Sequence, residues 1–417
     1  MGPHGRLPGT RYRRGVIGLR DIRDARARVG PVLRPTPPDR SDSLSRLAGR
    51  RVVLKPEHLQ RTGSYKIRGA YNLVSRLAAQ NGQGPGVVAG SAGNHAQGVA
   101  LAASLTGLTA TIFMPTNAPL PKVEATRSYG ATVRLEGAGV YEAIAAAQEH
   151  ARSTGATYVP PFDDPLIVAG QGTVGLEVGE EVDDASVVVV PTGGGGLLSG
   201  VATALAHTRR DVRVVGVQAA GAAAMRAALD AGHCVCLDQV ATMADGIAVR
   251  QVSDLTLAHV RAYVDDVVTV TEEEISQAVV LLLERAKAVV EPAGAVGVAA
   301  LLAGKIPGTG TAVAILSGGN VDPLLLIRLI DHGLSAAGRY LVLRIVLDDR
   351  PGSLALLTGA VAAMGLNVLS VEHHRSGVAL PVEEVEVLMT VETRDPSHRD
   401  EVVRDLRQAG FRVELVR

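Results

Sequence analysis

Short apolar runs alternate with longer Ala- and Leu-rich stretches over residues 17–335 of the chain. Buried parallel strands typically read as continuous apolar runs, and the stretches between them have helical spacing. This alternation predicts an α/β fold in which helices cover both faces of parallel sheet. The runs fall at 52–54, 86–89, 109–113, 132–135, 187–190, 212–217 and 311–316, and clear helical stretches at 96–105 and 140–154.

The pattern changes after residue 338. Strand-like runs at 341–347, 367–374, 382–392 and 411–415 are interrupted by helical stretches at 353–364 and 397–409. The resulting order is βαββαβ, the split ferredoxin-like unit. We therefore expect a second domain at 340–417, a linker at 331–339 and a first domain at 17–335. Residues 1–16 are basic, lack an apolar segment of signal-peptide length, and are interpreted as a disordered leader.

Composition excludes several functional classes. The 417 residues carry 42 basic and 42 acidic side chains, 3% aromatics and no Trp, which argues against a nucleic-acid partner. No apolar run approaches the roughly 20 residues of a membrane span, and a cytoplasmic location is the default. Cys234 and Cys236 are too few for a disulfide framework. With His233 they lack a second ligand pair, so no metal site is expected.

Lys66 lies in the segment GSYKIRGA, between small and apolar residues. Partial desolvation lowers the pKa of a lysine and frees its amine for Schiff-base chemistry. For a lone lysine, an alternative is a side chain that simply extends its charge to the surface.

Two glycine-containing segments follow predicted strands. Ser91, Ala92, Gly93, Asn94 and His95 form a turn whose N–H groups suit a carboxylate or phosphate, or which simply caps the next helix.

The run Gly193, Gly194, Gly195, Gly196 and Leu197 allows close backbone approach to a phosphate. It matches neither the P-loop nor the dinucleotide fingerprint, which favours a smaller phosphate ester. A merely flexible loop is the alternative.

Ser317 begins a third segment, SGGN, directly after the run 311–316. Its hydroxyl could cap the next helix or meet a ring nitrogen.

Taken together, these segments resemble the fold type II pyridoxal phosphate (PLP) enzymes, and among them the threonine/serine dehydratases. The resemblance covers nearly all of residues 20–335. It rests on GSYKIRGAYN, SAGNHAQGVA, PFDDPLIVAGQGTVGLE, PTGGGGLLSG, ADGIAV, VEPAGA and LSGGN, at 63–72, 91–100, 161–177, 191–200, 244–249, 290–295 and 316–320. It implies two parallel-sheet subdomains, the smaller and mobile one at roughly 63–165.

The resemblance also implies roles for individual residues. Lys66 would carry PLP as a Schiff base and act as general base, Asn94 would bond the phenolic oxygen, and Ser317 would meet the pyridine nitrogen. Gly193 to Gly196 with Leu197 would hold the phosphate, Ser91 to His95 would cradle the substrate carboxylate, and Glu291 would lie near the ring.

The implied reaction is α,β-elimination, giving 2-oxobutanoate and ammonia from L-threonine, or pyruvate and ammonia from L-serine. Relatives that racemise serine carry a second serine where this chain has Ala92. Gln218 stands where some relatives bind a divalent cation through glutamate.

Residues 341–417 resemble an ACT domain, which often binds amino acids between paired copies. The resemblance implies an effector site at Arg350, Pro351, Gly352, Ser353 and Asn367, isoleucine or valine as effector, and a homodimer or homotetramer. An ACT-like fold that only mediates oligomerisation is the alternative.

Three rival functions stay open at this point. They are a serine racemase, a PLP-dependent β-replacement enzyme, and a non-catalytic amino-acid sensor. The sequence does not rank threonine against serine, nor a biosynthetic role toward isoleucine against a catabolic one.

Overall fold

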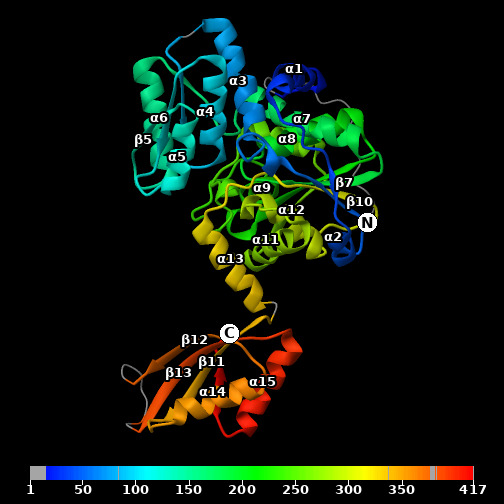
Figure 1. The fold of residues 1–417 in the computed structure, drawn as a ribbon. Coiled ribbons are helices and arrows are strands. Elements are labelled where there is room, and N and C mark those ends of the chain that lie inside the picture. The colour runs from blue at the N-terminus through cyan, green and yellow to red at the C-terminus, as the bar shows by residue number, and fades with distance from the viewer. Residues whose placement is uncertain (1–15, 83, 337, 376–380, 382, 417) are drawn as a thin grey trace. The chain divides into compact units, whose positions relative to one another are not determined.

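The computed structural model describes residues 16–82, 84–336, 338–375, 381 and 383–416 (Figure 1). The chain divides into two compact units, residues 1–323 and 324–417. The first unit contains two sheets and the second contains one. Among the described residues, no helix is both long and apolar enough to cross a membrane.

A six-stranded sheet forms the larger part of the first unit. Its strand order is β1-β2-β10-β7-β8-β9, and only β1 runs antiparallel to its neighbour. The carboxyl ends of the parallel strands therefore meet at one edge, where open α/β sheets bind their ligands. The strands are β1 Asp39–Arg40, β2 Val52–Lys55, β7 Ala185–Pro191, β8 Arg213–Ala219, β9 Asp266–Val270 and β10 Thr311–Ile315.

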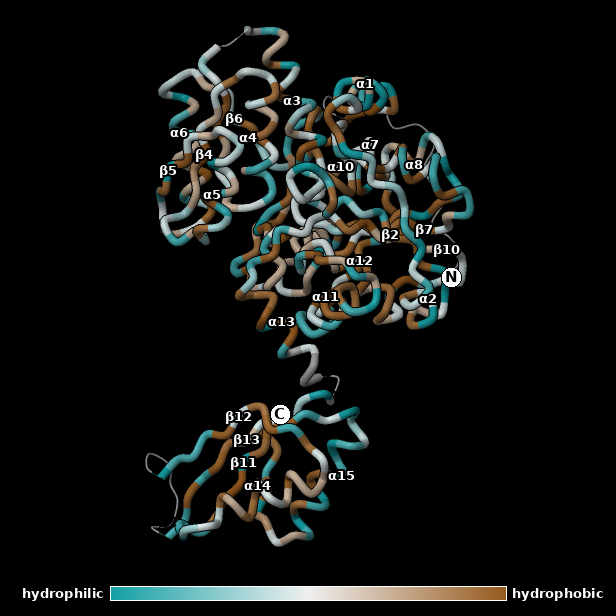
Figure 2. Tube along the Cα trace, viewed as in Figure 1, coloured by the Kyte–Doolittle hydropathy of each residue, from teal (hydrophilic) through white to brown (hydrophobic). Residues whose placement is uncertain are grey.

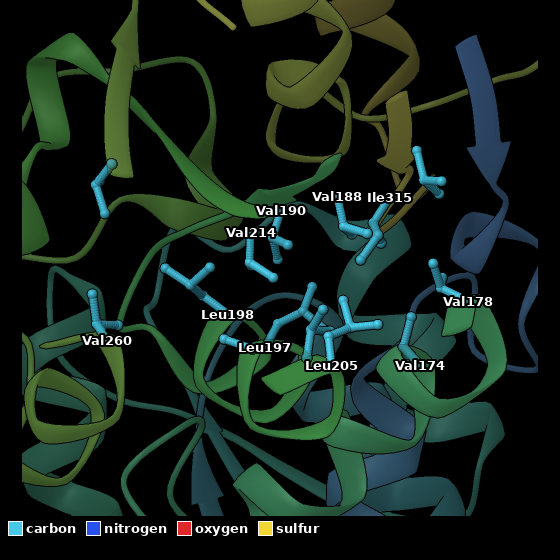
Figure 3. Packing of buried hydrophobic residues seen from close by; sticks show 14 of the residues in the cluster. Val174, Val178, Val188, Val190, Leu197, Leu198, Leu205, Val214, Val260 and Ile315 are labelled. Carbon is cyan, nitrogen blue, oxygen red and sulfur yellow. The ribbon is translucent and has the colours of Figure 1, made fainter. Parts of the chain in front are cut away.

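Helices cover this sheet on both faces. Val188 and Val190 of β7 pack with apolar residues of helices α7 (Pro165–Glu181) and α8 (Gly196–Thr208), as Figure 3 shows. The alternate residue Val189 lies beside Gly297 of helix α12. The other helices are α1 Leu19–Val29, α2 Asp42–Ala48, α9 Ala224–Ala231, α10 Asp254–Tyr263, α11 Glu272–Ala286 and α12 Pro292–Leu302, with 3-10 turns at Gly30–Val32, Glu57–Leu59, Ala220–Ala222 and Asp245–Ile247.

The smaller sheet has the order β5-β4-β3-β6 and is parallel throughout. One face packs against α3 and α4 through residues such as Ile67 and Ile112, and the other packs against α6 through Val88 and Ala147. The elements are α3 Lys66–Asn81, β3 Val87–Gly90, α4 Asn94–Thr106, β4 Ala110–Met114, α5 Leu120–Ser128, β5 Thr132–Leu135, α6 Val140–Thr154 and β6 Thr157–Tyr158.

The expected α/β class with parallel sheet is confirmed, and each predicted strand overlaps an observed one. The apolar pattern missed β1, β6 and β9. Two of these strands are only two residues long, and β9 is an edge strand whose Asp266 and Thr269 interrupt the apolar run. Edge strands tolerate such residues because one side faces no neighbour.

The second unit contains an antiparallel sheet of order β12-β13-β11-β14 with two helices against it. Figure 2 shows apolar residues along β11 and β13, the two central strands. The expected βαββαβ order is confirmed. Its elements are β11 Tyr340–Asp348, α14 Ser353–Ala363, β12 Val368–His374, β13 Glu384–Glu392, α15 Pro396–Gln408 and β14 Arg412–Leu415, preceded by α13 Pro323–Ala336. The predicted linker at 331–339 thus begins within a helix, and the predicted leader falls almost wholly outside the described residues.

Candidate active site

Lys66 is the first residue of α3, and its Nζ donates a hydrogen bond to the carbonyl oxygen of Pro161 at 3.0 Å. Burial lowers the pKa of Lys66 from its usual 10.5 to about 8, although the nearby Glu291 carboxylate acts in the opposite direction. A larger fraction of this amine than of an ordinary lysine is therefore neutral near physiological pH. A neutral, confined amine can act as a nucleophile and as a base.

The four-glycine loop joins β7 to α8. Gly195 has φ +92°, a left-handed conformation that favours glycine. A Cβ on Gly194 would lie 2.2 Å from Cδ1 of Phe162, so this glycine is needed for close packing. Phe162 follows Pro161, the hydrogen-bond partner of Lys66, and thereby brings the lysine and the loop together.

The same loop has backbone N–H groups that an anion could accept. The first N–H groups of α8 have no partner within the helix, and a helix N-terminus favours negative charge. Among the hydrogen bonds of the described residues, no backbone carbonyl accepts from the N–H groups of Gly194 to Leu197. Leu197 itself is buried in the core below the loop (Figure 3).

The turn from Ser91 to His95 connects β3 to α4. Ser91 Oγ accepts from the N–H of Gly93 at 3.2 Å, so this hydroxyl supports the turn itself. His95 is buried, and burial together with the charge of Lys66 lowers its pKa to about 3. The imidazole is therefore neutral, and its Nε2–H donates to the carbonyl of Val159 at 2.8 Å because a carbonyl can only accept.

Asn94 connects this turn to Glu291 at the start of α12. Its Nδ2 donates to Glu291 Oε1 at 2.6 Å. Burial, and secondarily the charge of Asp245, raise the pKa of Glu291 to about 7. The carboxyl group can therefore change its protonation state near neutral pH.

Ser317 follows β10 and is buried. Its carbonyl accepts from the N–H of Tyr65 at 3.1 Å, and the next residue, Gly318, pairs with Ser64 in an isolated antiparallel bridge. A Cβ on Gly318 would lie 2.8 Å from Nδ2 of Asn94. These contacts place Ser317 beside both the Lys66 segment and the Asn94 turn, so the structure brings the predicted cofactor residues together.

Sequence reasoning missed an ion-pair cluster around Arg68, two residues after Lys66 in α3. The fully buried guanidinium of Arg68 pairs with Glu57 and Glu177, and Lys55 also pairs with Glu177. The members of this cluster come from distant parts of the chain: Glu57 follows β2, and Glu177 lies in α7. Sequence spacing alone therefore does not identify them as partners of Arg68.

The described residues contain no cluster of three or more His, Cys, Asp or Glu side chains that could hold a metal ion. Gln218 accepts from the N–H of Arg226 at 2.9 Å and donates to the carbonyl of Ala222 at 3.3 Å, so its amide is used within the fold. The thiol of Cys234 donates a hydrogen bond to Oδ1 of Asp254 at 3.4 Å, and burial raises the pKa of this thiol to about 11.

The donor set fits PLP. Lys66 provides an amine with a lowered pKa, the glycine loop provides backbone donors for a phosphate, and Asn94 and Ser317 provide neutral hydrogen-bonding groups. Residues 29–318 match the family described as pyridoxal-phosphate dependent enzyme, and residues 341–411 match the ACT domain. The chain belongs to the family of pyridoxal-phosphate dependent enzymes and carries a C-terminal ACT domain.

The chain is also similar to individual proteins of known sequence or structure. The chain is 47% identical to the L-threonine ammonia-lyase of Thermotoga maritima over 402 residues, which cover 96% of this chain and all of that protein. Its fold is similar to tomato (Solanum lycopersicum) threonine deaminase isoform 2, with TM-score 0.71, 35% identity and coverage of 80% and 98% of the two chains. Maize serine racemase aligns with TM-score 0.72, 35% identity and coverage of 77% and 99%.

Within the ACT domain, the five predicted effector residues do not lie at one place in a single copy. Arg350, Pro351, Gly352 and Ser353 follow the Asp348 end of β11, whereas Asn367 contacts Glu392, which pairs with Tyr340 at the other end. Eight residues of strand separate the two ends, about 27 Å at the usual rise.

Proposed function

We propose that the protein is an L-threonine ammonia-lyase that also accepts L-serine. The observation that carries this proposal is the partly buried Lys66 amine, with its pKa lowered to about 8 by desolvation, near a glycine loop and a buried, neutral Ser317. The full-length similarity to the Thermotoga maritima ammonia-lyase, which includes the ACT domain, supports threonine as substrate.

In the proposed reaction, PLP and Lys66 have separate roles. PLP, when bound, supplies an electron sink for the carbanion that forms at the substrate α-carbon. Lys66 would hold the cofactor, be released when substrate binds, and then take the α-proton as general base. Loss of the β-hydroxyl as water and later hydrolysis of the product yield 2-oxobutanoate and ammonia.

The surroundings of Lys66 favour elimination. Ser317 is a neutral partner for a ring nitrogen, and unlike an aspartate it does not hold that nitrogen protonated. Ala92 has no proton to transfer, so the face opposite Lys66 lacks the acid that a racemase needs. The turn from Ser91 to His95 provides N–H groups for the substrate carboxylate, and neutral His95 adds no charge.

The direct test measures ammonia and 2-oxo acid from L-threonine and L-serine with the purified, PLP-loaded protein. We expect both products from L-threonine, and Lys66→Ala should abolish turnover together with the visible absorbance of bound PLP. Failure of both substrates to give an oxo acid would refute the proposal. Rapid β-replacement with sulfide would instead favour the rival lyase class.

The similarity to maize serine racemase supports a second candidate function. Chiral analysis of L-serine incubations distinguishes the two. Formation of D-serine at a rate comparable to that of pyruvate would make the protein a racemase.

We further propose that the ACT domain binds an amino-acid effector, with isoleucine or valine as first candidates, and that the enzyme is a cytoplasmic homo-oligomer serving isoleucine synthesis. In one copy, Arg350 to Ser353 form the candidate site, and Asn367 would contribute only at a separate location. Threonine turnover should change on addition of isoleucine or valine. If threonine turnover were equal with and without isoleucine and valine, the ACT domain would have only a role in oligomerisation.

A further inference from the structure

Asn320 forms a hydrogen-bond chain that reaches the cofactor side of Asn94. Its Nδ2 donates to the carbonyl oxygen of Thr62 and to Oδ1 of Asn94, both at 2.7 Å. The Nδ2 of Asn94 then donates to Glu291 Oε1 at 2.6 Å. The four groups, from Thr62, Asn94, Glu291 and Asn320, come from four separate segments of the chain.

The direction of this chain follows from the chemistry of its ends. A backbone carbonyl only accepts, so Thr62 requires the NH₂ group of Asn320 to face it. The same NH₂ group reaches Asn94, and it must therefore meet the carbonyl oxygen of the Asn94 amide. The NH₂ group of Asn94 is then directed to the opposite side, toward Glu291.

Close packing holds Asn320 in this place. Gly63 has φ +69°, and a Cβ there would lie 2.4 Å from Oδ1 of Asn320. Glycine at position 63 therefore makes room for the amide. Thr62, whose carbonyl accepts from Asn320, directly precedes Gly63 in the chain.

We propose that Asn320 is a positioning residue that fixes the amide of Asn94 with its NH₂ group toward the cofactor. One hydrogen of that group serves Glu291, and the second is available to the phenolic oxygen of PLP. If the Asn94 amide were reversed, its carbonyl oxygen would face the ring oxygen and, whenever Glu291 is ionised, a carboxylate, and both of these accept.

Asn320→Asp tests this function because the change keeps the shape and removes the donor. The carboxylate cannot donate to Asn94, which would turn its NH₂ group toward position 320. We expect PLP affinity, measured by titration of the apo-protein and visible absorbance, to fall on the order of ten-fold, the effect of losing one partly buried hydrogen bond. Asn72→Asp is a matched control at a buried asparagine that contacts Leu166 and Arg28 instead.

A double-mutant cycle separates positioning from a general effect on the loop. In the Asn94→Ala background, Asn320→Asp should cause no further loss of PLP affinity, because the amide it orients is gone. An equal loss in both backgrounds, or no loss in the single variant, would overturn the proposal. If Asn320→Asp fails to fold, Asn320→Ala enters the same cycle.

This inference depends on the contact between Asn94 and PLP and not on the substrate. The readout is cofactor affinity, so a protein that binds PLP normally but does not deaminate threonine would refute the proposed function and leave this test valid.

Discussion

Replacing Arg68 with methionine should destabilise the protein strongly. The five N–H groups of its guanidinium all have acceptors, with bidentate pairing to Glu57 at 2.7 Å and to Glu177 at 2.6 and 2.8 Å, and a bond to Thr173 at 2.9 Å. Burial alone would lower the pKa of Arg68, but the two carboxylates hold it above its ordinary value. The side chain is therefore a permanent cation that compensates buried negative charge.

The magnitude follows from what remains after the change. Methionine fills much of the space. Within the described part of the chain, it leaves the fully buried Glu57 side chain with the hydroxyl of Thr36, at 2.6 Å, as its only donor. Removing one partner of a buried ion pair costs about 3–5 kcal/mol, a large share of the roughly 5–15 kcal/mol that stabilises a typical domain. Arg152→Met is the control, because its partner Glu149 and Arg152 itself are each 68% exposed and the change should cost less than about 1 kcal/mol.

Urea denaturation of the PLP-loaded variants, followed by circular dichroism, measures these free energies. Arg68→Met with Glu57→Gln should recover part of the loss, since the glutamine carries no charge. A free energy of unfolding within 1 kcal/mol of the wild type for Arg68→Met would refute the reasoning.

The pH dependence provides an independent check. Burial by itself would raise the pKa of Glu177, but Arg68 and Lys55 hold it below its usual 4.5. A lowered folded-state pKa stabilises the protein above the unfolded value, and this stabilisation is lost as pH falls through the folded value. The difference between the wild type and Arg68→Met should therefore shrink in acid.

Three further predictions concern the active site. Incorporation of PLP into the apo-protein should accelerate with pH, with a midpoint near pH 8, since burial lowers the pKa of Lys66. Glu291→Gln should move this midpoint to lower pH, and a midpoint near 10.5 would contradict the reasoning. Ala92→Ser should raise D-serine formation from L-serine, measured by chiral chromatography, with unchanged product ratios as the contrary result. Gly194→Ala should force Phe162 to move at roughly 1–3 kcal/mol and weaken PLP binding, which a titration would detect.

Local features of the sequence determined the fold class and indicated the candidate members of the cofactor site. Apolar runs and helical spacing are properties of neighbouring residues, and they identified both domains and most strands. The glycine loop, Asn94 and Ser317 could be placed at strand ends, and the carboxyl ends of parallel strands meet at one edge. The edge strand β9 was not predicted, because its polar residues interrupt the apolar pattern.

The tertiary structure alone decided how these groups act on one another. Asn320 meets Asn94 across 226 residues, and Arg68 meets Glu177 across 109. Burial, which shifts the pKa values of Lys66, His95 and Glu291, is likewise a property of the packed chain. Hydrogen-bond direction and desolvation depend on groups that are distant in sequence and adjacent in space, so no local pattern encodes them.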